Sequence, residues 1–215
     1  MSKAICVMGE SGSGKTTAMR TLNPETTYYI DCDKKGLAWK GWRNQYNKEK
    51  KNFLADRDLS KIQTVLIGVS QSRPDIKTIV VDTLNTAMVD KEIKSMGDGS
   101  GFGKWIDLTQ FVWNICEIAS VLRDDLTVVI SMHSETVRDD FGYNFTRIKT
   151  NGRKLEKVVL ESLFSTVLLA KKKEDGTHVF ETVAKQSTAK APMGAFDSDE
   201  IPNDMAAVLA ALEDF

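Results

Sequence analysis

Eight consecutive residues near the start of the chain have the types and spacing that bind nucleotide phosphates. They match the phosphate-binding loop pattern G-x-x-x-x-G-K-[ST] and are Gly9, Glu10, Ser11, Gly12, Ser13, Gly14, Lys15 and Thr16. Glycines let the backbone wrap a phosphate chain, so that its N–H groups point at the anion. Lys15 is then expected to reach the β- and γ-phosphates, and Thr16 to bind Mg²⁺. This loop, extended by Thr17, predicts a site for ATP and Mg²⁺.

The segments on both sides of the loop agree with this interpretation. Residues 4–8 are a continuous apolar run typical of a buried strand, and residues 17–22 follow with a helical pattern. A strand before the loop and a helix after it are the context that phosphate-binding loops require. The same residues also fit G-x-x-G-x-G-K, which small-molecule kinases use, so the loop alone leaves the reaction open.

A second landmark is an acid at the end of an apolar strand. Residues 77–83 read Lys-Thr-Ile-Val-Val-Asp-Thr, with Asp82 at the end of the apolar run. This is the pattern of a Walker B strand, whose aspartate holds the Mg²⁺ shell. An acid at a strand end is common by itself. Together with the loop, it predicts that Asp82 and Thr16 lie on either side of one metal ion.

The other segments alternate between strands and helices, which indicates an α/β fold. We expect this alternation at residues 27–31, 59–69, 84–96, 105–122 and 126–132. Uninterrupted apolar strands between helices predict a mainly parallel central sheet with helices on both faces. Strands at 164–171 and 178–185 flank an Asp-Gly turn and predict a C-terminal antiparallel hairpin.

Shorter elements are expected towards the C-terminus. Residues 155–163 read as a helix and residues 186–199 as a loop. A last helix at 203–212 has Asn203 or Asp204 as its cap. No internal repeat or linker is present, so residues 1–215 are predicted to form a single domain.

The strand at 126–132 leads directly into His133. Doubly wound α/β folds bind their ligands in the crevice outside the carboxyl ends of the strands. His133 is therefore expected beside the terminal phosphate, where an imidazole can donate a hydrogen bond. A purely structural role for this single histidine is an equally open interpretation.

Two segments combine basic and aromatic residues. Residues 134–154 read as a long polar loop that contains Arg138, Phe141, Tyr143, Phe145, Arg147, Lys149, Arg153 and Lys154. Bases stack on rings while cations meet phosphates, so this loop predicts contact with single-stranded nucleic acid; a β-structure with packed aromatics is the alternative. Residues 34–51 have a similar composition, but we favour inward packing of their rings, Trp39, Trp42 and Tyr46.

Composition limits the classes of protein to consider. The chain has 215 residues, 41% of them hydrophobic, and a net charge of −1, so nucleic acid must meet a local patch. Cys6, Cys32 and Cys116 are far apart and read as buried apolar residues in a reducing compartment, not as zinc ligands. Neither a secretion signal nor a membrane span is recognisable, so we expect a cytoplasmic protein without a membrane partner.

The order of these pieces resembles the RecA-like recombination ATPases, a group of P-loop NTPases. The resemblance rests on the phosphate-binding loop, Ile30-Asp31-Cys32-Asp33, Asp82-Thr83-Leu84, the glycine-rich segment 97–104 and the basic segment 134–154. It covers nearly the whole chain for the small phage-type RecA-like proteins that anneal single strands. It implies a RecA-like fold, a role in DNA recombination or annealing, and the host cytoplasm if the protein is phage-encoded.

The resemblance also implies roles for particular residues. Asp33 takes the place of the glutamate that activates the attacking water in RecA proteins, and His133 that of the glutamine that senses the γ-phosphate. Lys104 in the glycine-rich segment and the basic segment after His133 correspond to the two DNA-binding loops. Lys190 resembles a lysine that related ATPases offer to a neighbouring subunit's nucleotide, which implies a homo-oligomeric ring or filament. A single-strand binding protein is a further candidate partner.

Two other classes of function stay open beside a DNA-stimulated ATPase. A nucleotide or small-molecule kinase shares the loop and the parallel sheet, but it needs an arginine-rich lid. No compact cluster of arginines is present beyond Arg138, Arg147 and Arg153. The other class is a nucleotide-dependent switch or assembly protein with little turnover, because Asp33 is shorter than the glutamate of RecA proteins.

Overall fold

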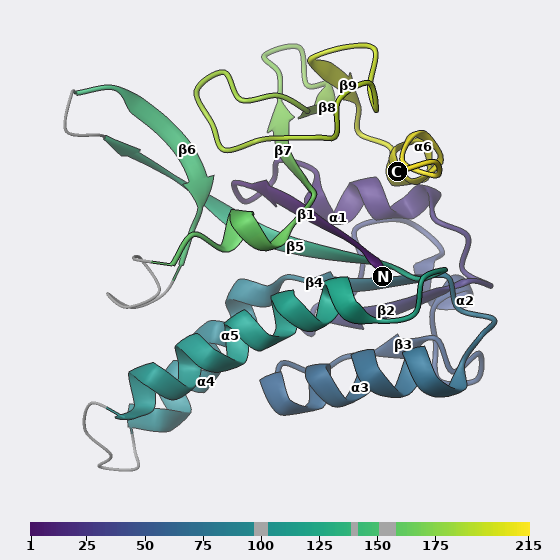
Figure 1. Cartoon of the computed structure of the whole chain (residues 1–215). Helices are drawn as coiled ribbons and strands as arrows, with labels where there is room; N and C mark the ends of the chain where they lie inside the picture. Colours follow the sequence, from purple (N-terminus) through teal and green to yellow (C-terminus); the bar gives the residue numbers. More distant parts are fainter. Residues whose placement is uncertain (97–102, 139–141, 151–157) are drawn as a thin grey trace.

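The computed structural model describes residues 1–96, 103–138, 142–150 and 158–215 (Figure 1). Within these residues, nine strands form a sheet in the order β3-β2-β4-β5-β1-β7-β8-β9, with β6 paired to β5. The strands are β1 (Lys3–Gly9), β2 (Thr27–Asp31), β3 (Phe53–Leu54), β4 (Thr78–Asp82), β5 (Thr127–Arg138), β6 (Asn144–Ile148), β7 (Thr166–Lys172), β8 (His178–Glu181) and β9 (Glu200–Pro202). The pairs from β3 to β7 are parallel, whereas β6, β8 and β9 join antiparallel. This confirms the predicted α/β fold with a mainly parallel sheet and C-terminal antiparallel strands.

Helices cover both faces of the sheet (Figure 1). One face packs against α3 (Leu59–Ser72), α4 (Leu84–Met96) and α5 (Gly103–Val121), and the other against α1 (Lys15–Ala18), the 3-10 turn η1 (Met19–Thr21) and α6 (Met205–Ala211). Successive strand residues point to opposite faces. In β1, Cys6 and Met8 therefore join the core under α3 to α5, while Ile5 and Val7 join the core under α1 and α6.

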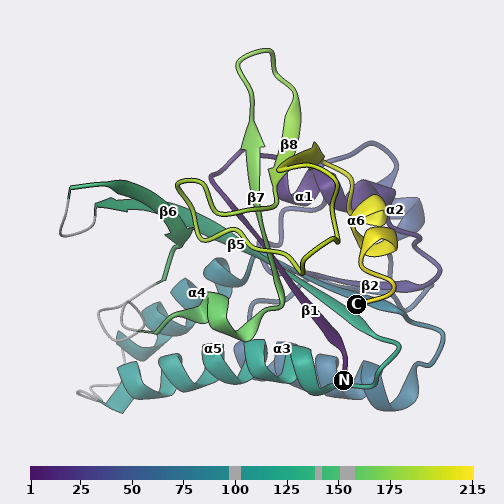
Figure 2. The same ribbon diagram turned by 45° about the horizontal axis from the view of Figure 1, so that its top comes forward.

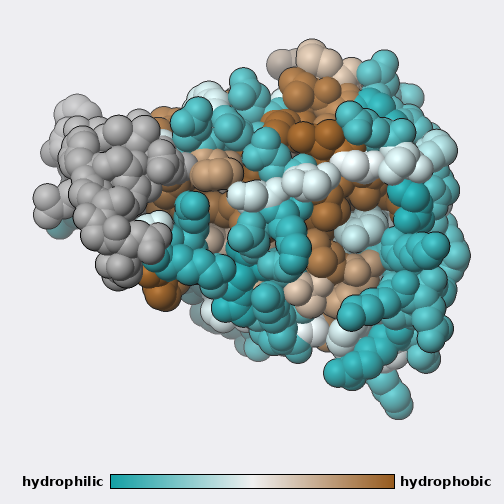
Figure 3. Space-filling view, turned by 90° about the horizontal axis from the view of Figure 1, so that it is seen from below, coloured by the Kyte–Doolittle hydropathy of each residue, from teal (hydrophilic) through white to brown (hydrophobic). Residues whose placement is uncertain are grey.

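The amphipathic pattern and its cap are confirmed in α3. Its buried residues are Leu59, Ile62, Leu66 and Val69, and the Asp58 side chain accepts a hydrogen bond from the Lys61 N–H at 3.1 Å. Figure 3 views the molecule from this side and shows mainly hydrophilic residues with apolar ones grouped between them. Within the described residues, no helix has the length and apolar character needed to cross a membrane.

The aromatic residues of segment 34–51 pack inward, as the sequence favoured. Tyr46 is fully buried, and Trp39 and Trp42 lie against the core on the α1 side. Trp39 and Tyr46 pack against Tyr29 of β2, with the Tyr46 and Tyr29 ring centroids 5.4 Å apart, and Trp42 packs against Phe53. Only a short helix, α2 (Trp42–Gln45), forms here. The rings therefore serve the core and are not free to stack on bases.

The prediction of a long loop at 134–154 is wrong for the residues that the structure describes. β5 continues past His133 to Arg138 and pairs with β6, from Ser134 with Ile148 to Arg138 with Asn144. Thr136, Val137 and Phe145 have the β-branched and aromatic side chains that favour strands. The result is a hairpin that extends away from the body of the protein (Figures 1 and 2).

Three smaller differences concern the C-terminal third. Of the predicted helix at 155–163, residues 155–157 lie outside the described residues, and the rest contains the 3-10 turn η3 (Leu160–Leu163). The predicted hairpin forms from β7 and β8, with Gly176 at φ 86° in its turn, but β8 ends at Glu181. The short strand β9 was not predicted. Asp204 caps α6 by accepting from the Ala207 N–H at 3.1 Å, as expected.

Candidate nucleotide-binding site

The phosphate-binding loop joins the end of β1 to α1 and requires two of its glycines. Gly12 has a φ of 80° and Gly14 a φ of 100°, a left-handed conformation that side chains rarely adopt. Space is also short at Gly14, where a Cβ atom would lie 2.8 Å from the ring of His178. The helix after the loop is a single α turn followed by η1. The amides of the loop itself must therefore supply most of the positive potential for a phosphate.

The ammonium group of Lys15 is folded back onto this loop. Its Nζ donates to the carbonyl oxygens of Gly9 and Glu10, each at 2.8 Å, and the residue is 6% exposed. Burial is the largest cause that lowers the pKa of Lys15 to about 8, against the opposing charge of Asp82. A phosphate chain in the loop would supply the negative charge that this ammonium lacks.

Asp82 accepts hydrogen bonds from a group of hydroxyls. Among the described residues, four hydroxyls donate to its carboxylate, those of Thr16, Tyr29, Thr83 and Ser131. The Thr16 bond measures 2.7 Å and the Tyr29 bond 2.6 Å. Tyr29 on β2 and Ser131 on β5 reach the carboxylate because these strands flank β4 in the sheet. The fold thus brings Thr16 of the phosphate-binding loop into contact with Asp82 at the end of the Walker B strand.

The oxygen atoms at Thr16 suit Mg²⁺. The Thr16 hydroxyl donates a hydrogen bond to Asp82, so the lone pairs of its oxygen are free to bind a cation. Mg²⁺ prefers oxygen ligands and usually binds through one or two protein groups, substrate phosphates and water. In the part of the chain that the structure describes, no three His, Cys, Asp or Glu side chains gather as a metal cage. A cation would therefore be held by Thr16 and nucleotide phosphates, with Asp82 behind the hydroxyl.

Asp33 lies in a short loop after β2, and hydrogen bonds to the Asp31 side chain fix the conformation of this loop. The Asp31 carboxylate accepts from two backbone N–H groups further along this loop, at 2.9 and 2.8 Å. Asp33 accepts hydrogen bonds from Lys35 Nζ and from Thr86 Oγ1 in α4. Burial alone would raise the pKa of Asp33, but these bonds and the charge of Lys35 outweigh it and lower the pKa. At neutral pH the carboxylate is ionised and able to orient a water molecule.

His133 pairs with Gly9 in the register of β5 and β1, which places it beside the loop although β5 does not end there. The Asn85 side chain accepts from the His133 N–H at 2.7 Å and donates to the Lys149 carbonyl at 2.7 Å. The Lys149 N–H donates to the His133 carbonyl at 2.8 Å. Burial, followed by the charge of Lys15, lowers the pKa of His133 below its usual 6.5. The ring is therefore neutral at pH 7 and has one N–H, for which a phosphate would compete with the backbone of Gly9.

These groups line one cavity of about 230 Å³. Most of the loop from Ser11 to Thr17 borders it, together with Asp33, His133 and His178. The structure thus brings together the phosphate lysine, the metal hydroxyl, the acid and the histidine that sequence reasoning selected separately.

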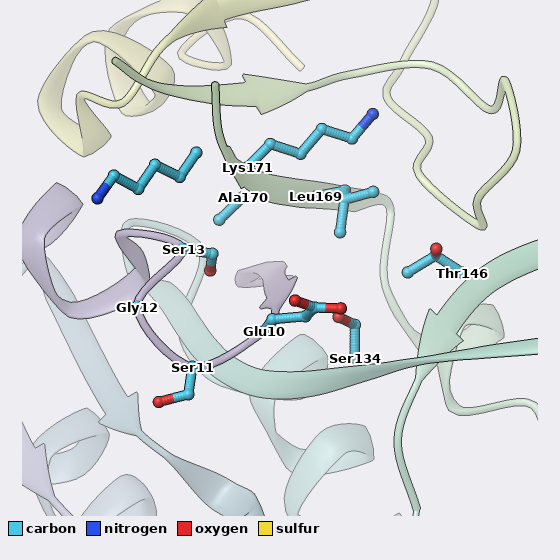
Figure 4. Close-up of a pocket in the computed structure, with 10 residues that line it drawn as sticks. Glu10, Ser11, Gly12, Ser13, Ser134, Thr146, Leu169, Ala170 and Lys171 are labelled. Carbon is cyan, nitrogen blue, oxygen red and sulfur yellow. The ribbon is translucent and has the colours of Figure 1, made fainter. Parts of the chain in front are cut away.

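A second cavity of about 330 Å³ also borders the loop (Figure 4). Its lining combines the loop with β5, β6 and β7 and includes Glu10, Ser13, Ser134, Thr146 and Lys171. Figure 4 shows the Glu10 carboxylate directed towards Ser134. This cavity is larger, but it lacks the lysine, hydroxyl and acid that bind phosphates and metal. The smaller cavity is therefore the candidate for the phosphates.

Lys190 does not reach the smaller cavity within one subunit. Its backbone N–H and carbonyl pair with Val167 of β7, and Val167 lies beside Cys6 in the sheet, upstream of the loop. The role implied for Lys190 concerns a neighbouring subunit, so it stays a prediction.

The predicted nucleic-acid residues that can be placed lie on the β5–β6 hairpin. Arg147 Nε donates to Glu135 Oε1 at 2.9 Å, and Arg138 donates to a backbone carbonyl of the turn at 2.9 Å. Tyr143 is 74% exposed, and Phe145 is half-buried. Outside the described residues lie the side chain of Lys104 with its glycine-rich segment 97–102, Phe141, Arg153 and Lys154.

Sequence reasoning missed several side chains that position the site. Tyr29 and Ser131 are polar residues inside apolar strands, which was a visible signal of a buried partner. Asn85 and Thr86 follow Asp82 in the first turn of α4, where a polar pair is common and carries no signal by itself. Their partners, His133 and Asp33, are distant in sequence.

The comparisons with known proteins agree with this geometry. A family model described as an AAA domain (AAA_24) matches residues 1–191. Among curated proteins, none matches the chain. The matched range includes the loop, Asp33, Asp82, His133 and His178, and therefore the whole cavity. The chain belongs to the AAA domain family and is a P-loop ATPase domain.

Proposed function

We propose that this protein is a Mg²⁺-dependent ATPase that acts on single-stranded DNA in recombination or strand annealing, as small phage-type RecA-like proteins do. The observation that carries the nucleotide part is the convergence of Lys15, Thr16 and Asp33 on one cavity. Attack of water on a γ-phosphate needs a cation on the phosphates, a bound metal and a group that orients the water. Each of these has a candidate in the cavity.

The residues divide the reaction among them. The loop amides and Lys15 bind the β- and γ-phosphates, and Lys15 stabilises the negative charge that develops there. Asp33 orients the attacking water and accepts its proton. His133 donates a hydrogen bond to the γ-phosphate. Mg²⁺ at Thr16 adds positive charge at the phosphates.

The contact between Lys35 and Asp33 supports a second candidate, a nucleotide switch with little turnover. In the free protein the Lys35 ammonium is bonded to one oxygen of the Asp33 carboxylate. A cation at this position makes the carboxylate a weaker base. Hydrolysis would then stay slow after ATP binds unless Lys35 moves away from Asp33.

The nucleic-acid part of the proposal is supported by the connection between the cavity and the hairpin. The backbones of His133 and Lys149 are hydrogen-bonded to each other, and both are hydrogen-bonded to the Asn85 side chain. A change at His133 on ATP binding would therefore reach Lys149, the residue that follows hairpin strand β6. Beyond Lys149, the hairpin offers the cation Arg147 and the exposed ring of Tyr143, and such pairs suit phosphates and bases.

A homo-oligomeric ring or filament completes the proposal. In such an assembly, Lys190 of one subunit would approach the nucleotide of the next and add positive charge in the transition state.

The first test is ATP hydrolysis with Mg²⁺, measured with and without single-stranded DNA. We expect DNA to raise the rate, and Lys15→Ala to lower hydrolysis by about 100-fold or more, because a preorganised charge on the phosphates is lost. Unchanged hydrolysis by Lys15→Ala would remove the loop from the mechanism. Tight ATP binding without hydrolysis would favour the switch, and phosphate transfer to a nucleoside monophosphate would favour a kinase.

A matched pair of charge variants tests the hairpin. Arg147→Ala removes a cation, whereas Glu135→Gln keeps the arginine and removes the carboxylate that neutralises it. We expect the first to weaken binding of single-stranded DNA and the second to strengthen it, with opposite changes in the salt dependence of about one phosphate contact each. Equal DNA affinity in both variants and the wild type would exclude this hairpin as the contact surface.

A further inference from the structure

One wall of the nucleotide cavity comes from the C-terminal hairpin and carries no recognisable motif. His178, the first residue of β8, lines the cavity together with Gly14 and Thr17. Its Nδ1 lies 2.9 Å from the carbonyl oxygen of Ser13. A Cβ atom on Gly14 would stand 2.8 Å from the same nitrogen. The imidazole is therefore packed directly on the loop and held there by a hydrogen bond.

This contact decides which ring nitrogen of His178 is left for a ligand. A carbonyl oxygen can only accept, so Nδ1 must carry the proton that it donates to Ser13. In the neutral imidazole, Nε2 is then an acceptor. Among the described residues, the ring has no second hydrogen-bond partner. His178 thus brings an unused acceptor to the wall of the cavity.

Asn203 also lies close to Gly14, but it is not among the residues that line the cavity. It is 5% exposed, and its Nδ2 lies 3.3 Å from where a Cβ on Gly14 would be. Neither its Oδ1 nor its Nδ2 has a partner among the described residues. Its backbone is fixed, because Arg20 donates to the Asn203 carbonyl at 3.1 Å. Both amide atoms are buried away from the cavity, so His178 is the side chain of this hairpin that offers an acceptor to a ligand.

The phosphates of a nucleotide already have binding partners in the cavity. Lys15 and Thr16 take the phosphates and the metal, and Asp33 lies with them in the cavity. What remains of a nucleoside triphosphate is the nucleoside, whose ribose hydroxyls and base amino group donate hydrogen bonds. An unprotonated Nε2 accepts a hydrogen bond from such a group, whereas an unprotonated phosphate oxygen has no proton to donate to it.

We propose that His178 binds the nucleoside part of a nucleoside triphosphate. The C-terminal hairpin then distinguishes a nucleotide from a bare polyphosphate, while the loop binds both through the phosphates. This inference rests on the proposed nucleotide function of the same cavity.

The test compares the affinities for ATP and for inorganic tripolyphosphate, both with Mg²⁺, in wild type and two variants. His178→Asn places an amide N–H near the position of Nδ1, which keeps the bond to Ser13 but removes Nε2. His178→Gln places its amide near Nε2 instead. We expect His178→Asn to bind ATP about 3- to 10-fold more weakly, the range for one hydrogen bond, and tripolyphosphate as the wild type does. His178→Gln should keep more of the ATP affinity.

The outcomes separate this inference from the nucleotide function. Equal affinities of the wild type and His178→Asn for ATP would leave His178 with its bond to Ser13 alone and overturn the inference. Parallel loss of ATP and tripolyphosphate affinity in His178→Asn would also overturn it, because the loop would then be disturbed. A wild type that binds neither probe would overturn the nucleotide function itself.

Two analogues identify the donor on the nucleoside. Inosine triphosphate lacks the base amino group, and 2′,3′-dideoxy-ATP lacks the ribose hydroxyls. If His178 accepts from one of them, the analogue without it should bind to wild type and to His178→Asn with equal affinity. If both analogues still lose affinity in His178→Asn, neither donor is the partner, and the assignment of Nε2 falls.

Asn203→Ala provides an independent check. Because the amide makes no hydrogen bond in the free protein, its removal should leave the midpoint of thermal unfolding without nucleotide nearly unchanged. The same variant should bind ATP and tripolyphosphate as the wild type does, because Asn203 does not line the cavity. Loss of ATP affinity in Asn203→Ala as large as that in His178→Asn would mean that disturbance near Gly14, and not the loss of Nε2, weakens binding, and would overturn the inference.

Discussion

The nucleotide cavity and the β5–β6 hairpin differ in how firmly their polar side chains are held. At the cavity, Lys15 and Asp82 are almost fully buried, and each has several partners before any ligand binds. On the hairpin, Tyr143 is largely exposed and Arg147 has one ion pair at the surface. A small-ligand site is usually preformed, whereas a surface for a long polymer stays open until the polymer arrives.

This difference explains why the cavity indicates its ligand more specifically than the hairpin does. Burial of a charge is costly, and a phosphate in the loop would offset this cost for Lys15, so the cavity favours a specific kind of ligand. Surface cations on a hairpin are also typical of a solvated strand. The four predictions below test the contrast, beginning with the largest expected effect.

Asp33→Asn tests the most specific chemical role in the cavity. The amide keeps the shape of the side chain but cannot accept a proton from water, so we expect hydrolysis to fall by about 100-fold or more. ATP affinity, measured by titration calorimetry, should change little. If the variant hydrolyses ATP at the wild-type rate, another group orients the water.

Tyr29→Phe tests whether the hydroxyls around Asp82 hold the cavity together. The variant removes a buried hydrogen bond to a carboxylate, and such bonds contribute about 1.5–3 kcal/mol. The free energy of unfolding in urea should fall by about this amount, while hydrolysis at a temperature well below unfolding persists. Tyr46→Phe is the matched control, because the Tyr46 ring packs against Tyr29 but its hydroxyl interacts with Thr27 and not with Asp82. Equal stability of Tyr29→Phe and the wild type would contradict the role assigned to this bond.

Asn85→Ala tests the link between the two regions. Its side chain bridges the His133 N–H and the Lys149 carbonyl, so its loss should uncouple the hairpin from the nucleotide. We expect the stimulation of hydrolysis by single-stranded DNA to fall several-fold while the rate without DNA stays near that of the wild type. Both rates come from one preparation, so a misfolded fraction would lower them equally. Full stimulation in the variant would mean that any coupling bypasses Asn85.

The smallest effect concerns His133 and pH. Burial lowers the pKa of this ring, with Lys15 and Lys149 acting in the same direction and Asp33 against them. Between the folded pKa and 6.5, the unfolded chain binds more protons than the folded chain, so stability falls as pH drops through this window. His133→Gln cannot titrate and should show a shallower loss in urea unfolding from about pH 7 to pH 5. Identical pH profiles would show that His133 is not desolvated in the folded protein.

Much of the fold was predictable because its signals are local. The apolar runs at β1, β4 and β5, the cap at Asp58 and the turn at Gly176 each depend on a few neighbouring residues. A β-structure after His133 was only the alternative to the favoured loop, because the polar residues of this segment hide the alternation of a strand and its pairing partner lies several residues further on. The inward packing of Trp39 and Trp42 was favoured on composition and is confirmed by their contacts with the core.

By itself, the sequence determined a loop of the phosphate-binding type between a strand and a helix, since spacing within Gly9–Thr16 controls that geometry. It also determined an α/β fold through the alternation of apolar strands and helices. Only the tertiary structure decided that Tyr29 and Ser131 bond to Asp82, and that His178 closes one wall of the cavity. These contacts join separate strands through the order and register of the sheet, and no local pattern of residues encodes which strands become neighbours.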